Sequence, residues 1–120
     1  MDRLKDKVVI VTGGAGGIGL GMSKAMAKEG AIIAIVDVNE EAGQASLKVL
    51  QEISPKSMFL KADLMDRDKL PTIITTVAEA YGKIDVLVNN AHASKQVTIE
   101  ETTQADLDLS FGTGFYPTFY

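Results

Sequence analysis

The chain has 120 residues, of which 46% are hydrophobic and 23% charged, so it can bury the core of one globular domain spanning residues 1–120. The formal net charge of −4, with no basic run to offset it, argues against binding a nucleic-acid backbone. With no cysteine and a single histidine, the chain offers no disulfide and no ligand set for zinc, and we expect no bound metal.

The N-terminal residues lack the pattern of a targeting or membrane segment. The charged stretch DRLKDK precedes an apolar run that reaches glycines within four or five residues. A signal peptide and a membrane-spanning helix both need a longer apolar segment. We therefore expect a soluble, cytoplasmic protein that does not bind a membrane.

The first predicted element is a buried strand that runs into a glycine-rich turn. Four β-branched residues at 8–11 are followed by TGGAGGIG, and an amphipathic segment begins near Gly17. Glycine adopts positive φ without steric cost and lets a ligand lie against the backbone. A helix starting near Gly17 presents unpaired N–H groups and its positive dipole end, which favours a phosphate group above the turn.

A helix and a second strand are predicted after this turn. Gly30 is suited to end the helix, and the continuous apolar run 31–36 predicts a parallel strand that is covered on both faces. Helical spacing divides the helix into two faces. Expected against the sheet are Ile18, Met22, Ala25, Met26 and Glu29, and expected to face away are Ser23, Lys24 and Lys28.

A second helix and a third strand follow in the same alternation. Asn39 is suited to cap the helix, Ser54-Pro55 would stop it, and a strand is predicted over 58–62. The residues expected to form the buried stripe of this helix are Ala42, Ala45, Val49 and Ile53.

A third helix is predicted over 66–81 from its apolar face, although its β-branched run has weak helix propensity. Pro71 is tolerated if the helix begins near Asp68, and Gly82 ends it. A fourth strand is predicted over 84–89. The residues expected on the buried face of this helix are Leu70, Ile73, Ile74, Val77 and Ala78.

The last predicted helix starts with a capping box formed by Thr103 and Asp106. Its continuation is poor, because two glycines and a proline follow at Gly112, Gly114 and Pro117. The alternation of strands and helices predicts an α/β fold with right-handed crossovers and a parallel sheet that has helices on both faces.

An acidic residue ends the second predicted strand. Asp37 lies 18 residues after Gly19, which is the spacing of a dinucleotide site in which the acid binds the ribose hydroxyls. No Lys-Ser/Thr pair follows the glycines, so a Walker-type phosphate loop is excluded. Two plain alternatives stay open: the glycines serve only a tight turn, or Asp37 only caps one.

The same carboxylate bears on the choice of cofactor. Asp37 would lie where the 2′-phosphate of NADP must go, and two like charges ~4 Å apart repel by several kcal/mol at an intermediate dielectric. No arginine or lysine lies between Gly13 and Gly19 or directly after Asp37 to compensate. NAD(H) is therefore expected rather than NADP(H).

Three motifs, each at a predicted strand end, resemble the classical short-chain dehydrogenase/reductase family. Residues 12–19 match its TGxxxGxG loop, Asp63-Leu64 resembles its acidic residue after the third strand, and residues 89–92, NNAH, resemble its NNAG motif. The resemblance implies an incomplete Rossmann-type, doubly wound sheet of about four strands in the order 3-2-1-4. It also implies the N-terminal, cofactor-binding half of an NAD(H)-dependent oxidoreductase acting on a small secondary alcohol or carbonyl compound.

The resemblance further implies four groups of cofactor-binding residues. The turn would hold the pyrophosphate, and the ends of the second, third and fourth strands would respectively meet the adenosine ribose, flank the adenine, and line the cofactor while bracing the sheet. In that order they are Gly13, Gly17, Ile18 and Gly19; Asp37 and Val38; Asp63 and Leu64; and Asn90 and Ala91. Asp63 as a carboxylate approaching a helix, and Asn89-Asn90 as turn formers, stay open.

Two positions depart from the family pattern. His92 stands where the family has glycine, so an imidazole either projects toward the cofactor cleft or is only a loop residue. Matching the stretch from Gly114 onward to the family's NxxGTF places Gly114 where the family has its catalytic asparagine. A glycine has no amide side chain, so the proton relay would be altered or supplied by another group.

No catalytic residue is assigned. In the family the catalytic serine and the YxxxK pair lie beyond the fourth helix, and neither Tyr116 nor Tyr120 has a lysine four residues on. The chain alone is therefore expected to bind NADH without turnover. An exposed sheet edge is also expected, which favours pairing with another copy or with a further segment. The alternatives are a non-catalytic or truncated dinucleotide-binding module and, more weakly, a flavin or other nucleotide binder.

Overall fold

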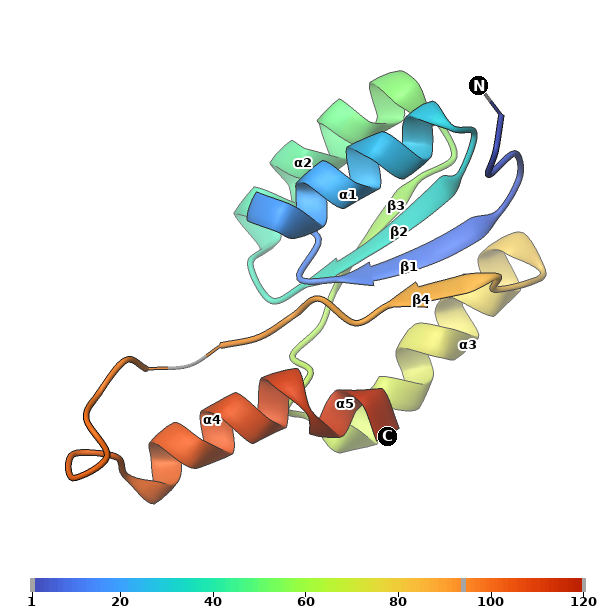
Figure 1. Cartoon of the computed structure of the whole chain (residues 1–120). Helices are drawn as coiled ribbons and strands as arrows, with labels where there is room; N and C mark the ends of the chain where they lie inside the picture. The colour runs from blue at the N-terminus through green and yellow to red at the C-terminus, as the bar shows by residue number, and fades with distance from the viewer. Residues whose placement is uncertain (1, 94, 120) are drawn as a thin grey trace.

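A parallel four-stranded sheet in the order β3-β2-β1-β4 forms the centre of the computed structural model, which describes residues 2–93 and 95–119 (Figure 1). Its strands are β1 (Val8–Thr12), β2 (Ile32–Asp37), β3 (Met58–Lys61) and β4 (Val86–Val88). All four predicted strands and their predicted order are confirmed. β4 is shorter than the predicted strand at 84–89.

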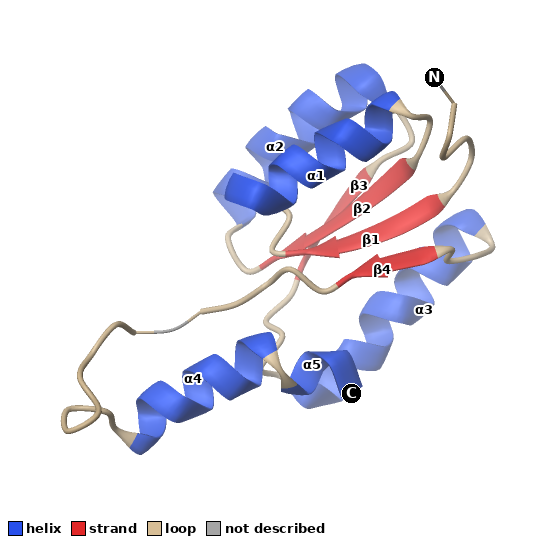
Figure 2. Ribbon diagram, viewed as in Figure 1, coloured by secondary structure: helices blue, strands red, loops and turns tan. Residues whose placement is uncertain are grey.

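Helices cover both faces of this sheet, as predicted (Figure 2). α1 (Gly17–Lys28) and α2 (Glu40–Ile53) pack on one face, and α3 (Leu70–Tyr81) packs on the other. After β4 the chain forms α4 (Gln104–Gly114) and the short α5 (Tyr116–Phe119). In the described ranges 2–93 and 95–119, no helix is long and apolar enough to cross a membrane.

Alternate residues of the central strands enter two separate cores. Val8 and Ile10 of β1 pack with α3, whereas Val9 and Val11 pack with α1 and α2. These four side chains are almost wholly buried, which is why the sequence of β1 is apolar throughout instead of alternating. The double burial fixes β1 at the centre of the molecule.

The buried face of α1 differs from the predicted one. Of the predicted face, Met26 packs against the core, but Ile18 is 77% exposed. The buried residues are Gly19, Ser23 and Ala27. These small residues recur every four positions and let the helix backbone approach the strands closely. The Ser23 hydroxyl donates to the Gly19 carbonyl oxygen at 2.9 Å, so it is buried without losing a hydrogen bond.

The predicted stripe of α2 was wrong at Ala45 and Val49, whereas Ile53 packs against the core as predicted. Ala45 and Val49 are exposed, and the buried residues are Gly43, Ser46 and Leu50. A Cβ at Gly43 would overlap the ring of Phe59 on β3, so the absent side chain makes room for an aromatic one. The predicted cap is confirmed, since the Asn39 side chain accepts a hydrogen bond from the Ala42 N–H at 3.0 Å.

The boundaries of α3 and α4 differ in part from the predicted ones. A 3-10 turn over Arg67–Lys69 precedes α3, so the helix begins at Leu70 and not near Asp68. Gly82 ends it at φ 78° as predicted, but Ile74 of the predicted buried face is exposed. The predicted capping box at Thr103 is confirmed, and α4 continues through Gly112 despite the poor expected continuation.

Aromatic contacts explain why α4 continues through Gly112. Phe111 packs edge-on against Phe115 with ring centroids 6.0 Å apart, and both rings contact Tyr116. The Arg67 guanidinium lies 4.5 Å from the centre of the Tyr116 ring. These contacts fix α4 and α5 to the turn before α3, while the body of α4 extends away from the sheet (Figure 1).

β4 lies at one edge of the sheet, and Val86 and Leu87 are 36% and 44% exposed. Asp85, just before this strand, ties the edge to the centre. Its carboxylate accepts the Val8 N–H at 2.8 Å and pairs with Lys83 at 3.0 Å. The Val8 hydrogen bond first, and then Lys83, hold the pKa of Asp85 below its ordinary value.

We predict that this carboxylate makes stability depend on pH. A depressed folded-state pKa means that ionised Asp85 stabilises the fold above the unfolded-state pKa of about 3.9, and that the contribution is lost as the pH falls through the folded-state value. Asp85→Asn should therefore lower the melting temperature at neutral pH, and its difference from wild type should shrink as the pH falls through the folded-state pKa of Asp85. Asp68→Asn, an exposed carboxylate, is the control; a pH-independent difference for Asp85→Asn would contradict the assignment.

Candidate functional site

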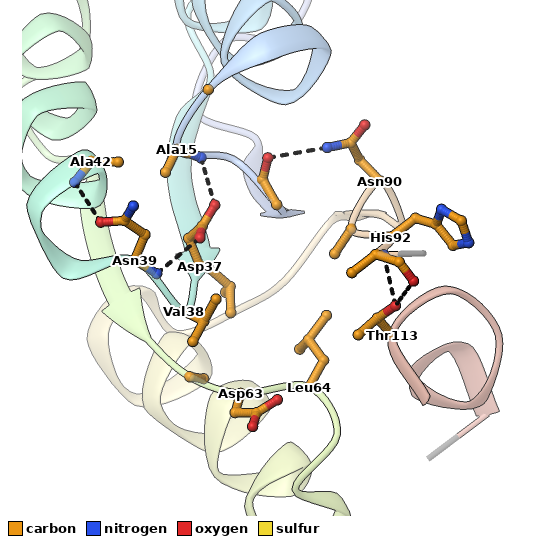
Figure 3. A pocket seen from close by; sticks show the side chains of 16 residues that line it. Ala15, Asp37, Val38, Asn39, Ala42, Asp63, Leu64, Asn90, His92 and Thr113 are labelled. Atoms are coloured by element: carbon orange, nitrogen blue, oxygen red, sulfur yellow. Dashed lines mark hydrogen bonds between the residues drawn. The ribbon is translucent and has the colours of Figure 1, made fainter. Parts of the chain in front are cut away.

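The carboxyl ends of all four strands meet around a pocket of about 440 Å³ (Figure 3). In open parallel sheets, ligands bind in the crevice outside these strand ends. Seven of the ten predicted site residues line the pocket, and Gly17, Ile18 and Gly19 lie beside it at the start of α1. The lining residues are Gly13, Ala15, Gly16, Val36, Asp37, Val38, Asn39, Ala42, Ala62, Asp63, Leu64, Asn90, Ala91, His92, Ala93 and Thr113.

The glycine turn folds tightly against the end of β4. Gly13 has φ 64°, and a Cβ there would lie 2.9 Å from Cα of Ala91. A Cβ at Gly19 would overlap the Gly13 carbonyl oxygen and lie 2.6 Å from Nδ2 of Asn90. These two glycines are therefore required by the close packing of the turn against α1 and the residues after β4.

The N-terminus of α1 is the end of the helix that faces this site. Its N-cap is Gly16, which has no side chain to cap the helix, and the first turn contains no acidic residue. By contrast, α2 is capped by Asn39 and has two acidic residues in its first turn, and α4 has a capping box. The first N–H groups of α1, together with its positive dipole end, are thus suited to an anionic group.

Asp37 links the second strand to the glycine turn. One carboxylate oxygen accepts the Ala15 N–H at 3.2 Å and the other accepts the Asn39 N–H at 3.0 Å (Figure 3). The turn-capping alternative is therefore present as a contact. The Asp37 carboxylate can still accept further hydrogen bonds, because each of its oxygens has a second acceptor position.

The end of β3 adds a second carboxylate and an apolar wall. Asp63 is exposed, and its carboxylate accepts the Met65 N–H at 2.9 Å, which matches the alternative of a carboxylate approaching a helix. Leu64 and Val38 line the same end of the pocket as Asp63 (Figure 3). A flat apolar group with polar edges could lie between these two aliphatic side chains.

A hydrogen-bonded cluster around Thr12 joins the turn to the end of β4. The Thr12 hydroxyl oxygen accepts the N–H groups of Asn90 and Ala91 at 3.1 Å each and lies 3.3 Å from the Val88 carbonyl oxygen as a donor. In return, the Asn90 side-chain amide donates to the carbonyl oxygens of Thr12 and Gly13 at 3.1 Å each. Asn90 therefore braces two strands, beyond the plain role of a turn former.

The opposite end of the pocket is built from the segment after β4 and from α4. Ala93 donates its N–H to the Thr113 hydroxyl at 2.8 Å, and His92 lies beside this contact (Figure 3). The sequence reasoning missed Thr12 and Thr113 as individual site residues. Thr12 is the first residue of the quoted loop motif, so a signal existed, whereas Thr113 is distant in sequence and nothing marked it.

The charges of the lining are sparse and negative. Among the described residues that line the pocket, only Asp37 and Asp63 are acidic, and none is a lysine or an arginine. Among residues 2–93 and 95–119, no group of three or more histidine, cysteine, aspartate or glutamate side chains could hold a metal ion. The site therefore offers backbone N–H groups to an anion and carboxylates to hydroxyl groups.

Comparison with known proteins assigns the family. The sequence profile described as short chain dehydrogenase matches residues 7–120. The chain belongs to the short-chain dehydrogenase family, as the motifs indicated.

Individual relatives agree with this assignment. The chain is 39% identical to a 3beta-hydroxysteroid dehydrogenase of Mediterraneibacter gnavus, covering 97% of this chain and 44% of that protein. It is also 39% identical to the Bos taurus 15-hydroxyprostaglandin dehydrogenase, whose name specifies NAD(+), over 95% of this chain and 43% of that protein. The chain thus spans somewhat less than half the length of these relatives.

A solved structure shows the same fold. L-Sorbose reductase from Gluconobacter frateurii, complexed with NADPH and L-sorbose, superimposes with a TM-score of 0.90 at 26% identity. The match covers 99% of this chain and 46% of that chain. The Rossmann-type arrangement expected from the sequence is therefore confirmed.

We predict that the hydroxyl of Thr12 is what holds this site together. Thr12→Val keeps the shape of the side chain but leaves the N–H groups of Asn90 and Ala91 without their acceptor, so it should lower the free energy of unfolding by about 1–3 kcal/mol. Thr12→Ser keeps the acceptor and should cost less. Urea unfolding of both variants measures the difference, and equal losses would contradict the role of the hydroxyl.

Proposed function

We propose that the pocket binds NAD(H) and that the protein is an oxidoreductase, transferring hydride between the nicotinamide and a small secondary alcohol or carbonyl compound. The observation that carries the proposal is the convergence of an uncapped helix N-terminus and two strand-end carboxylates on one pocket. A dinucleotide supplies a partner for each: its pyrophosphate is the anion for the helix N-terminus, and its ribose carries hydroxyl groups for a carboxylate. Family membership supports the same reaction class.

The proposed arrangement assigns each group of residues to a part of the cofactor. Backbone N–H groups around Gly13, Gly17, Ile18 and Gly19 would bind the pyrophosphate. Asp37 would accept hydrogen bonds from the adenosine ribose at its two remaining acceptor positions, with Val38 beside it. Asp63 and Leu64 would flank the adenine, and Asn90 and Ala91 would line the route toward the nicotinamide.

NAD(H) is proposed over NADP(H) on the charge at the end of β2. The relatives differ in cofactor, since one solved structure contains NADPH and one relative is named for NAD(+). In this chain the lining has two carboxylates and no lysine or arginine to neutralise a 2′-phosphate. Repulsion between Asp37 and that phosphate would be about 4 kcal/mol at ~4 Å and an effective dielectric near 20.

Sequence and charge support the remaining parts of the proposal. The net charge of −4 disfavours a nucleic-acid partner, and a cytoplasmic location and a homo-oligomer stay predictions. Pairing of copies is favoured by the partly exposed edge strand β4. The second candidate function is a dinucleotide-binding module without turnover, favoured by Gly114 at the position where the family has its catalytic asparagine. Tyr120 lies outside the described residues.

We predict that Asp37→Asn weakens the discrimination against NADPH. The amide keeps an acceptor for the turn while removing the charge, so the ratio of the NADPH and NADH dissociation constants should fall at least about tenfold, or 1.4 kcal/mol. Fluorescence titration with both nucleotides measures this ratio. Asp63→Asn is the control and should leave the ratio unchanged, because both nucleotides carry the same adenine; an unchanged ratio in Asp37→Asn would refute the ribose role.

We also predict that the 120-residue chain binds NADH but oxidises no secondary alcohol. Its described residues supply the binding elements, while its sequence contains no tyrosine with a lysine four residues on to act as general acid and base. Titration of NADH fluorescence and an absorbance assay on one preparation test both halves. A clear rate would overturn the second half, and absence of binding would overturn the first.

A further inference from the structure

We propose that His92 is a positioning residue for the bound dinucleotide: its imidazole, seated on Gly114 of α4, contacts the part of the ligand that extends to the end of the pocket away from Asp37 and Asp63. The identity of the ligand as a dinucleotide rests on the proposed function. The seating of the imidazole rests on the geometry alone.

The backbone around His92 is fastened to α4. The Ala93 N–H donates to the Thr113 hydroxyl oxygen at 2.8 Å, and that hydroxyl lies 3.2 Å from the Ala93 carbonyl oxygen and 2.7 Å from that of Leu109. Thr113 therefore holds the segment after β4 at the last turn of α4. This leaves the His92 side chain beside the next residue, Gly114.

The imidazole takes the space in which a side chain at 114 would begin. A Cβ on Gly114 would overlap Cδ2 of His92 and lie 3.3 Å from Cγ and Nε2. The backbone does not itself require glycine there, because the positive-φ glycines are Gly13, Gly17, Gly30 and Gly82. Alanine would be favoured over glycine in a helix. The position of the His92 ring is thus the reason why residue 114 has no room for a side chain.

His92 also differs chemically from the rest of the lining. It is the one basic side chain among the lining residues, and it lies at the same end of the pocket as Thr113 (Figure 3). If the adenosine lies against Asp37 and Asp63, the second half of the dinucleotide extends toward this end. The ring of His92 is exposed and lies against Gly114, so a ligand that extends to this end of the pocket would contact it.

The single histidine of the chain gives a direct test. The Hδ2 and Hε1 signals in a proton NMR spectrum of the full chain belong to His92 without further assignment. Titration with NADH should shift both signals, and Gly114→Ala should shift Hδ2 in the free protein because the ring must move. Gly21→Ala is the matched control, since a Cβ at this helical glycine meets nothing within 4 Å.

A double-mutant cycle separates positioning from stability. Gly114→Ala should weaken NADH binding about fivefold in the presence of His92 and leave it nearly unchanged in the His92→Ala background, as expected for residues in contact. The melting temperature of Gly114→Ala should not fall in that background, because the helix gains alanine and loses no contact. The same NADH loss in both backgrounds would overturn the inference.

The remaining outcomes distinguish this inference from the proposed function. NADH binding with unmoved imidazole signals overturns the positioning role and leaves the proposed function intact. Absence of NADH binding by the wild-type chain overturns the proposed function and the ligand assignment together. An Hδ2 signal unaffected by Gly114→Ala overturns the seating of the ring, whatever the ligand.

Discussion

The reciprocal hydrogen bonding between Thr12 and Asn90 is the interaction on which the rest of the site depends. One hydroxyl oxygen receives two backbone N–H groups from the segment after β4, and one amide returns two hydrogen bonds to the glycine turn. Thr12 is almost fully buried, so water does not replace these contacts at low cost. The cluster brings the turn, the start of α1 and the end of β4 to one point, and the pocket opens beside it.

Close approach of backbones is the second constraint, and small residues provide it. Gly19 and Ser23 let α1 lie against the sheet, and Gly43 accepts the ring of Phe59. An apolar-stripe argument places the largest side chains of a helix on its buried face. For α1 this expectation was wrong by one position. Small residues are buried there because dense packing of the helix against the strands is itself favourable. The hydroxyl of Ser23 can be buried because it donates a hydrogen bond within the helix.

The candidate site was foreseeable wherever it lies at the end of a strand. Asp37, Asp63 and Asn90 each follow an apolar run, and parallel strands bring their carboxyl ends to one edge, so their convergence follows from the strand order. The contact between the segment after β4 and α4 was not foreseeable. His92 and Thr113 are 21 positions apart, and only the docking of α4 beside the segment after β4 brings them together.

By itself, the sequence determined the α/β class and the family, because long apolar runs, helix caps and the glycine turn are local signals that agree with one another. The strand order was expected only from the resemblance to that family. Tertiary structure alone decided which face of α1 and α2 is buried, where α3 begins, and that Gly114 lies beneath the ring of His92. These outcomes depend on how closely two backbones approach. That distance is set by side chains on both partners at once, so no single segment encodes it.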